Sequence, residues 1–309
     1  MALLMFKNLV VYRVSASGGE PWAGTLAELE AGLAKARFMP CGATQPQSAG
    51  WVPPRDAEDP HAPLVESVGG QWLMRLVVEQ KVLPSAVVKR RTEEMAKKVE
   101  QATGRKPGKR QAKELKEEAV LTLLPQAFTK QASVNVWLDA KAGLLLVDAS
   151  SPKRAEDAAT LLVQAADGLA LRLVQTQLSP AAAMSAWLSG GEPPAAFTVD
   201  RECELKSADE MKSVVRYARH PLDTEEVRAH VLTGGKQPTR LALTWKGRVS
   251  FVLTDTLQIK KLSVDDGLFD AGSARGDEGF DADAAIATGE LRQMIPDLVA
   301  ALDGELPLA

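Results

Sequence analysis

Cysteine and histidine are scarce in this chain of 309 residues, and their spacing excludes several kinds of site. Cys41 and Cys203 lie far apart, so the sequence predicts neither a disulfide framework nor a zinc site. His61, His220 and His230 have no cysteine or carboxylate at the spacing of a metal motif. We therefore expect the protein to bind no metal and to use no cofactor.

Long apolar runs are missing too. No stretch approaches the roughly 18 residues that a membrane helix needs, and the apolar residues before Lys7 are too few for a signal-peptide core. The composition, with 45% hydrophobic and 25% charged residues, is that of an ordinary globular protein. These features predict a cytoplasmic protein without a membrane partner, long enough for about two domains.

Catalytic patterns are also absent. The segment from Gly104 to Lys109 resembles a phosphate-binding loop, but it is one residue short and has Arg110 where Ser or Thr should bind magnesium. A group of C-terminal carboxylates fits no calcium loop and predicts a solvated segment; its members are Asp265, Asp266, Asp270, Asp277, Asp281 and Asp283. No Ser-His-Asp or Cys-His arrangement stands out. We expect the protein not to be an enzyme.

Positive charge is concentrated in one segment. Between Lys89 and Glu118, eleven Lys and Arg residues face six Glu residues, so this segment carries +5; because the whole chain carries −3, the remainder carries −8. Many of the Glu residues stand at helical spacing from a cation, which predicts ion pairs along the helices. The concentration favours contact with a polyanion, although a solvated charged helix would explain it as well.

This segment predicts two helices. Small and apolar residues recur at steps of three and four along two stripes. The first stripe is Val88, Thr92, Met95, Val99 and Ala102, and the second is Ala112, Leu115, Ala119 and Leu123. Gly104, Pro107 and Gly108 interrupt them as a turn would. We expect an antiparallel helical hairpin over 84–127, inserted into a larger body.

The rest of the chain alternates between strand and helix patterns. Strands are expected at 6–14, near Trp51, and at 71–83, 132–139, 144–148, 171–174, 196–206, 240–245, 248–254 and 258–264. Helices are expected at 25–37, 151–168, 181–188, 223–234 and 284–302, with Asp223 and Glu226 as a capping box and 265–283 as a loop. This order predicts an α+β fold of mostly antiparallel sheets with helices on one face.

Several separate blocks then give the sequence a resemblance that covers almost its whole length. The blocks are Phe6–Leu9 with Tyr12 and Arg13, Phe38–Gly42, Gly50–Pro54, Lys81–Ser85, Leu123–Phe128, Lys153–Asp157, Leu241–Trp245, Phe280–Asp283 and Thr288–Leu291. In this order they resemble the RdgC family of bacterial, recombination-associated nucleoid proteins. The sequence departs from the family at Gln126, where a basic residue is expected.

The resemblance implies a fold and a function. RdgC-like proteins are ring-shaped homodimers that bind DNA, double- or single-stranded, without sequence preference and restrain RecA. For this chain, the resemblance implies a central domain of 1–83 and 128–178, a tip domain of 84–127 and a base domain of 179–309. Tip would meet tip and base would meet base across a two-fold axis. The expected partners are therefore DNA and a second copy of the chain, with RecA affected through the DNA.

Candidate site residues follow from the charge pattern and the resemblance together. The expected DNA contacts are Lys89, Arg90, Arg91, Lys97, Lys98, Lys109, Arg110, Lys113, Arg216, Arg219, Lys236 and Arg240. The last four flank a predicted helix and strand, so we expect them to share one surface. Phe128 and Leu124 are the expected dimer-interface residues, and the alternative for Phe128 is that it packs under the hairpin as local core.

Two other functions stay open on the sequence alone. The basic hairpin would also suit a non-enzymatic scaffold that binds acidic protein partners. The acidic C-terminal loop would be the place for a hydrolase centre. Salt-dependent retention on DNA would distinguish a DNA-binding protein from the scaffold. A hydrolase would require metal-dependent turnover of nucleic acid.

Overall fold

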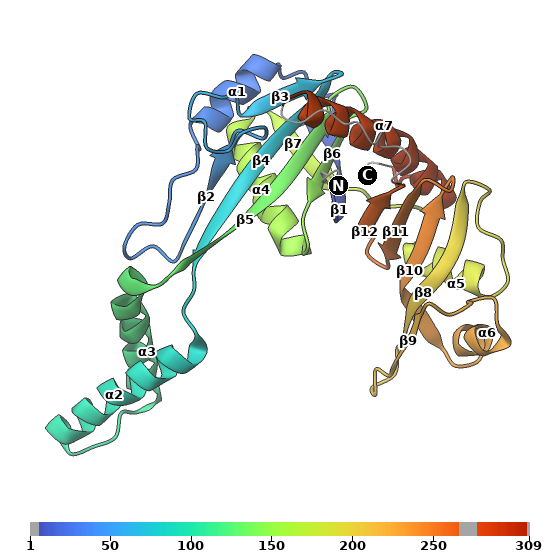
Figure 1. Ribbon diagram of the computed structural model, residues 1–309. Helices are drawn as coiled ribbons and strands as arrows, with labels where there is room; N and C mark the ends of the chain where they lie inside the picture. The colour runs from blue at the N-terminus through green and yellow to red at the C-terminus, as the bar shows by residue number, and fades with distance from the viewer. Residues whose placement is uncertain (1–5, 266–276, 308–309) are drawn as a thin grey trace. The chain divides into compact units, whose positions relative to one another are not determined.

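The computed structural model describes residues 6–265 and 277–307, which fall into two compact units (Figure 1). Unit 1 comprises Met1–Leu33, Pro53–Met74 and Asn135–Ala309, and unit 2 comprises Ala34–Val52 and Arg75–Val134. Strands β4 (Gln71–Lys81) and β5 (Thr129–Asp139) each pass from one unit into the other. The expected tip segment thus shares a unit with residues on both sides of it, and the three-domain division stays a prediction.

Unit 1 is built on an antiparallel sheet. Its strands follow the order β5-β6-β1-β12-β11-β10-β8-β9, with β7 paired to β1 and β3 paired to the first part of β4. The strands are β1 (Leu9–Ala16), β3 (Val65–Val68), β6 (Leu144–Asp148), β7 (Leu169–Leu173), β8 (Phe197–Ser207), β9 (Val214–Ala218), β10 (Lys236–Trp245), β11 (Val249–Thr254) and β12 (Ile259–Val264). The predicted α+β class with an antiparallel sheet is confirmed.

Strand β1 joins the N-terminal strands of this sheet to the C-terminal ones. Residues 9–13 pair with β6 along one edge of β1, and residues 12–16 pair with β7 along the other edge. On the same edge as β7, β1 meets β12 through the single register pair Leu9↔Ile259, and the Leu262 N–H donates to the Lys7 carbonyl at 2.9 Å. Leu9 and Ile259 are both fully buried, so the junction lies inside the core.

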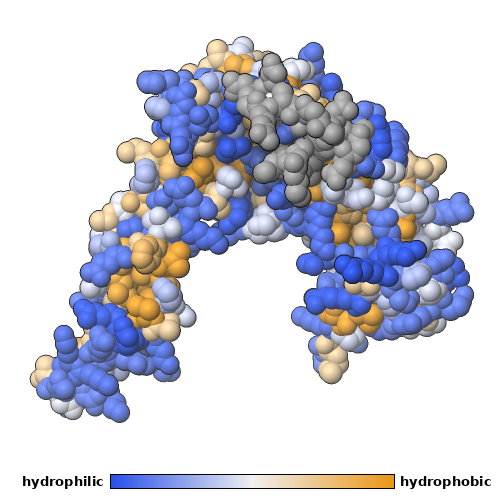
Figure 2. All heavy atoms as spheres, viewed as in Figure 1, coloured by the Kyte–Doolittle hydropathy of each residue, from blue (hydrophilic) through white to orange (hydrophobic). Residues whose placement is uncertain are grey.

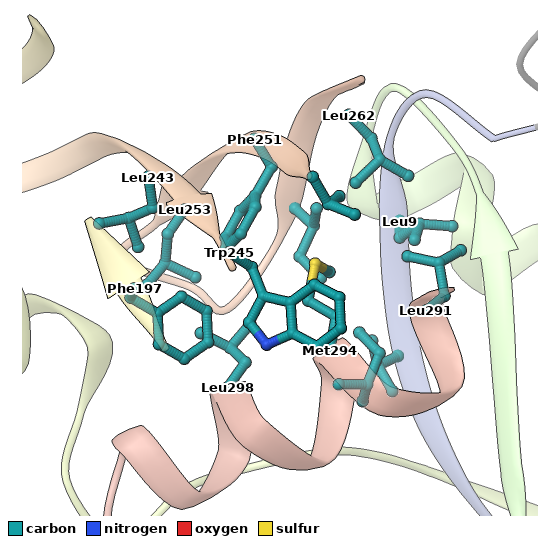
Figure 3. Packing of buried hydrophobic residues seen from close by; sticks show 14 of the residues in the cluster. Leu9, Phe197, Leu243, Trp245, Phe251, Leu253, Leu262, Leu291, Met294 and Leu298 are labelled. Atoms are coloured by element: carbon teal, nitrogen blue, oxygen red, sulfur yellow. The ribbon is translucent and has the colours of Figure 1, made fainter. Parts of the chain in front are cut away.

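The core on one face of the sheet centres on Trp245 (Figure 3). Because side chains alternate along a strand, β10 points Leu241, Leu243 and Trp245 to this face, where Met294 and Leu298 of α7 (Asp277–Ala301) meet them. The Trp245 indole N–H donates to Asp297 at 2.8 Å, which satisfies its polar atom. Helices α5 (Pro180–Leu188) and α6 (Glu225–Leu232) complete this layer.

Helix α4 (Pro152–Ala165) covers the opposite face. It packs on β6 and β7, and its buried alanines lie outside the cluster that holds Leu9, Leu146 and α7. Helix α1 (Leu26–Ala34) packs on α4, where Gly32 leaves no room for a Cβ against the Ala165 carbonyl. The expectation of helices on one face is therefore wrong, since both faces carry apolar rows that need cover.

Some element boundaries also differ from the expectations. Strands β3 and β9 were not predicted, and α7 begins at Asp277, inside the expected loop. Thr224 rather than Asp223 caps α6, by accepting the Val227 N–H at 3.4 Å.

Of the C-terminal carboxylates singled out in the sequence, Asp266 and Asp270 lie outside the described residues. Within the described ranges, every helix is too short or too polar to cross a bilayer.

Unit 2 contains two helices and three strand segments in the order β2-β4-β5, the last two being the second part of β4 and the first part of β5. Strand β2 (Gln47–Val52) pairs with the second part of β4, from Val52↔Arg75 to Gln47↔Gln80. Helix α2 (Ser85–Thr103) ends at Gly104, whose φ of 69° few other residues adopt. Helix α3 (Lys109–Leu123) then returns against α2 and leads into the short 3-10 helix η1 (Leu124–Gln126).

The first prediction concerns the core of unit 1. Trp245→Ala removes a fully buried ring and should lower the free energy of unfolding by about 3–5 kcal/mol, measured by urea titration with far-ultraviolet circular dichroism. The matched control is Leu232→Ala on α6, which is 66% exposed and should change it by at most about 0.5 kcal/mol. Equal losses would show that Trp245 is not the centre of the core.

Candidate nucleic-acid interface

Five ion pairs run along the two helices of unit 2. Their N···O distances are 3.1–3.9 Å, and each joins residues three or four positions apart. The pairs are Lys89–Glu93, Arg90–Glu94, Arg91–Glu94, Arg110–Glu114 and Lys113–Glu117. The expectation that part of this charge is used in pairs is confirmed. Such exposed pairs stabilise a helix by only about 0.3–0.5 kcal/mol each, so the cations stay accessible to a stronger anion.

The other six cations of this segment have no carboxylate in ion-pair range within the part of the chain that the structure describes. They are Lys97, Lys98, Arg105, Lys106, Lys109 and Lys116, and all but Lys116 lie in the turn at 104–108 or on the helix ends that flank it. Three of these, Lys97, Lys98 and Lys109, were predicted as DNA contacts from the sequence. The least compensated positive charge of unit 2 therefore lies at the turn between α2 and α3.

The base of the hairpin is fixed by polar contacts within unit 2. The Lys81 ammonium donates to the carbonyls of Ala43 and Leu124, each at 2.8 Å. The Glu79 carboxylate accepts the Cys41 N–H at 2.7 Å and the Gln131 amide at 2.8 Å. These bonds tie the end of α3 and the start of β5 to the end of β4. The residues that follow α3 are thereby presented in one conformation.

Phe128 is presented to solvent in this region. Its side chain is 88% exposed, whereas Leu124 is 3% exposed and packs inside unit 2. The alternative that Phe128 forms local core is therefore wrong. An apolar groove of 480 Å³ lies at the end of α3, lined in part by Pro46, Leu121 and Leu124. Figure 2 shows hydrophobic surface where α3 leads into β5, beside the hydrophilic surface toward the hairpin turn.

A second cationic surface lies on the sheet of unit 1, on the face opposite the Trp245 core. Cross-strand register places Glu204 of β8 between Arg216 of β9 and Arg240 of β10. Arg216 Nε donates to the Glu204 carboxylate at 2.6 Å. Arg240 lies opposite the same residue on the other side, so two arginines flank one carboxylate and this part of the face has net positive charge.

Two lysines of β12 extend this surface. Lys260 lies opposite Val252 of β11 and donates to the Ser150 carbonyl at 2.9 Å, and Lys261 pairs with Glu202 at 2.5 Å. Sequence reasoning did not select either lysine. Their positions between apolar residues of a predicted strand indicated that they face away from the core. The sequence did not show which strands lie beside β12, so it could not group these lysines with Arg216 and Arg240. We call Arg216, Arg240, Lys260 and Lys261 the sheet cations.

Electrostatic coupling along this face appears in two pKa shifts. Burial alone would raise the pKa of Glu204, but hydrogen bonds from Arg216 and Thr239 and the charge of Arg240 lower it overall. Burial lowers the pKa of Lys260, and the nearby positive charge of Arg240 lowers it further. A bound polyanion would reduce the repulsion between these crowded cations.

Lys236 and Arg219 do not join the sheet cations as expected. Thr239 is an extra residue in β10, because Pro238 pairs with Leu205 while Arg240 pairs with the adjacent Glu204. This bulge reverses the alternation, so Lys236 lies on the helical side, with its ammonium 3.3 Å from His230 Nδ1. Arg219 is exposed in the turn after β9, with a φ of 57°. The expectation that Lys236 and Arg240 share a surface is wrong.

Comparison with known proteins identifies the family. The model of a family described as "Putative exonuclease, RdgC" matches residues 4–305. The "Recombination-associated protein RdgC" of Dechloromonas aromatica (strain RCB) is 46% identical, over 98% of this chain and 99% of that protein. Proteins of the same name from Cupriavidus pinatubonensis and Bordetella pertussis are 45% and 39% identical, with the same coverage of each chain.

Fold and surface thus define an α+β protein with two separate cationic surfaces, on the hairpin of unit 2 and on the sheet of unit 1. Because the match covers nearly its full length, this chain belongs to the RdgC family. The resemblance found in the sequence is confirmed.

The second prediction tests the different environments of Phe128 and Leu124. Leu124→Ala opens a cavity in unit 2 and should lower the free energy of unfolding by about 2–4 kcal/mol. Phe128→Ala removes a side chain that is 88% exposed and should change it by at most about 0.5 kcal/mol. Both are measured by denaturant titration at one low protein concentration. A loss at Phe128 as large as that at Leu124 would mean that Phe128 packs as core.

Proposed function

We propose that this protein binds DNA without sequence preference, as a homodimer, and takes part in homologous recombination. The observation that carries the proposal is the location of the crowded or unpaired positive charge. In a chain of net charge −3, cations collect at the turn of the hairpin and along the open face of the sheet. The printed names of the relatives, which are recombination-associated proteins, point to the same process.

Lys and Arg side chains on helices and strands suit phosphate contacts. Such contacts position a protein on nucleic acid but do not read its sequence. The sheet cations are spread over β9, β10 and β12 of one sheet, so they would meet phosphates as a row and not as a single point. A scaffold for acidic proteins would use the same charges, but it would not retain DNA in a salt-dependent way.

The dimer would close around the DNA. Phe128 offers an exposed aromatic anchor, and an apolar groove lies four residues earlier at Leu124; aromatic residues of this kind dominate many interfaces. A two-fold contact between two such surfaces, with a second contact between C-terminal regions, would produce a ring. DNA inside such a ring would be retained mechanically, and RecA would be restrained because the DNA is already occupied.

We also propose that the protein acts without catalysis, although the family description includes the word exonuclease. The decisive assay incubates end-labelled single- and double-stranded DNA with the protein and Mg²⁺ or Mn²⁺. Intact DNA after many binding equivalents is the expected result. Metal-dependent release of nucleotides that follows the protein through purification would replace this proposal with a nuclease.

The third prediction concerns salt. If about five phosphates are neutralised, the logarithm of the binding constant should fall with the logarithm of salt concentration at a slope of about −4 to −5. Arg240→Ala combined with Lys260→Ala should reduce that slope by about 2. The measurement is fluorescence anisotropy with duplexes of unrelated sequence over a salt series.

The control for this experiment is Arg90→Ala combined with Lys113→Ala, which removes two cations that already pair with Glu94 and Glu117. It should alter the slope less than the sheet variant does. A binding constant that does not depend on salt, or a strong preference for one duplex sequence, would contradict the proposal.

The fourth prediction concerns ring closure. Phe128→Ala should leave the circular dichroism spectrum unchanged, weaken the dimer and speed DNA dissociation by about tenfold or more, because interface anchors commonly contribute about 2 kcal/mol. Sedimentation gives the mass, and a chase with excess unlabelled DNA gives the dissociation rate. Leu232→Ala, another exposed apolar truncation, is the control. A mutant that keeps both wild-type mass and retention would exclude Phe128 as the closing contact.

A further inference from the structure

A cavity in unit 1 lies at the junction of β1, β7, α4 and the turn between β11 and β12. Its volume is 430 Å³, and the lining residues that matter here are Val10, Tyr12, Glu156, Leu173, Thr256 and Gln258. This volume is within the range of about 300–1,000 Å³ typical of small-molecule sites. Nothing in the proposed phosphate contacts uses this cavity.

Its walls combine an aromatic and aliphatic floor with polar groups. Val10 and Tyr12 stand two positions apart on β1 and so share a face, and Tyr12 lies directly opposite Leu173 of β7. Leu173 is 43% exposed, which leaves the cavity open on that side. A flat ring could therefore enter from the Leu173 side and pack against Tyr12.

The polar groups converge from two other elements. Gln258 is buried, and its amide nitrogen donates to the Thr256 hydroxyl at 3.3 Å. That bond leaves the carbonyl oxygen of the Gln258 side chain as an acceptor. Glu156 brings a carboxylate from α4, and burial together with the charge of Glu156 raises the pKa of Tyr12. The cavity thus offers acceptors beside an aromatic face.

The cavity opens on the same face of the sheet as the sheet cations. The pair Leu9↔Ile259 points both side chains into the core. The neighbours Val10, Gln258 and Lys260 therefore point to the opposite face. Lys260 reaches the Ser150 carbonyl, just before α4 begins. A positive charge consequently stands at the rim, on the side from which a phosphate backbone would approach.

We propose that this cavity receives one unstacked nucleobase of single-stranded DNA while Lys260 and Arg240 hold the adjacent phosphates. A base brings a flat ring for Tyr12 and N–H groups for the Glu156 and Gln258 oxygens. Guanine fits best, because its N1–H and N2–H groups point the same way and match a carboxylate. A paired base cannot enter without leaving its stack, so the cavity distinguishes single strands from duplex. The inference rests on the proposed DNA binding.

The test fills the cavity without removing charge. Leu173→Trp places a large ring at its mouth, and the matched control Leu232→Trp makes the same change on α6, at a residue that is 66% exposed and outside the cavity. Anisotropy titrations of the full chain use single strands and blunt duplexes of equal length. Leu173→Trp should weaken single-strand binding about tenfold, as expected for one lost stacking contact, and leave duplex binding within about twofold.

Two further measurements make the outcome specific. A single strand with one 2-aminopurine should gain fluorescence on binding wild type, as that base leaves its neighbours, and should not do so with Leu173→Trp. Glu156→Gln should lose preference for dG-containing over dT strands. Glu156 is exposed, so this variant should fold even if Leu173→Trp does not.

The possible failures are distinguishable. Unchanged single-strand binding by Leu173→Trp, or equal losses for single strand and duplex, would overturn the nucleobase cavity while salt-dependent duplex binding kept the proposed function intact. A wild-type protein that binds neither form of DNA would overturn the proposed function and this inference with it.

Discussion

The pairing of β1 with β12 is the constraint on which the rest of unit 1 depends. One register pair, Leu9↔Ile259, and one further backbone bond join the N-terminal strands to the C-terminal ones. Both side chains are fully buried, so the register is held by burial more than by the number of hydrogen bonds. A slip of one residue would turn Lys260 and Gln258 into the core and expose Ile259. The sheet cations and the cavity share a face because this slip is prohibitively costly.

The positive charge of the chain serves two purposes that can be separated. Along α2 and α3, much of it is paired within the helix, which supports two exposed helices that have little apolar core of their own. At the hairpin turn and on the open face of the sheet, charge is crowded or unpaired, and it raises the local potential instead. Net charge alone would not distinguish these uses, because both kinds of residue are Lys or Arg in helices or strands.

The sequence was sufficient for features that depend on local pattern, and it failed where distant segments meet. Alternation located most of the strands, and periodicity located the two helices of unit 2 with the break at Gly104. The shared face of Lys236 and Arg240 was predicted wrongly because the Thr239 bulge depends on pairing with β8. Lys260 was missed because its neighbours come from elsewhere in the chain. The exposure of Phe128 was likewise undecided, since an aromatic residue after a helix suits a core as well as an interface.

The bulge at Thr239 also decides where one positive charge of β10 lies. Leu241, Leu243 and Trp245 are anchored in the core, and before the bulge Pro238 and Lys236 pair with Leu205 and Ser207 of β8. A strand that lost Thr239 would keep all of these pairs, so Lys236 would stay beside His230. A regular strand of unchanged length would instead reverse the residues before Arg240 and bring Lys236 to the open face. The extra residue thus keeps this charge on the helical side of the sheet without any change of amino-acid type.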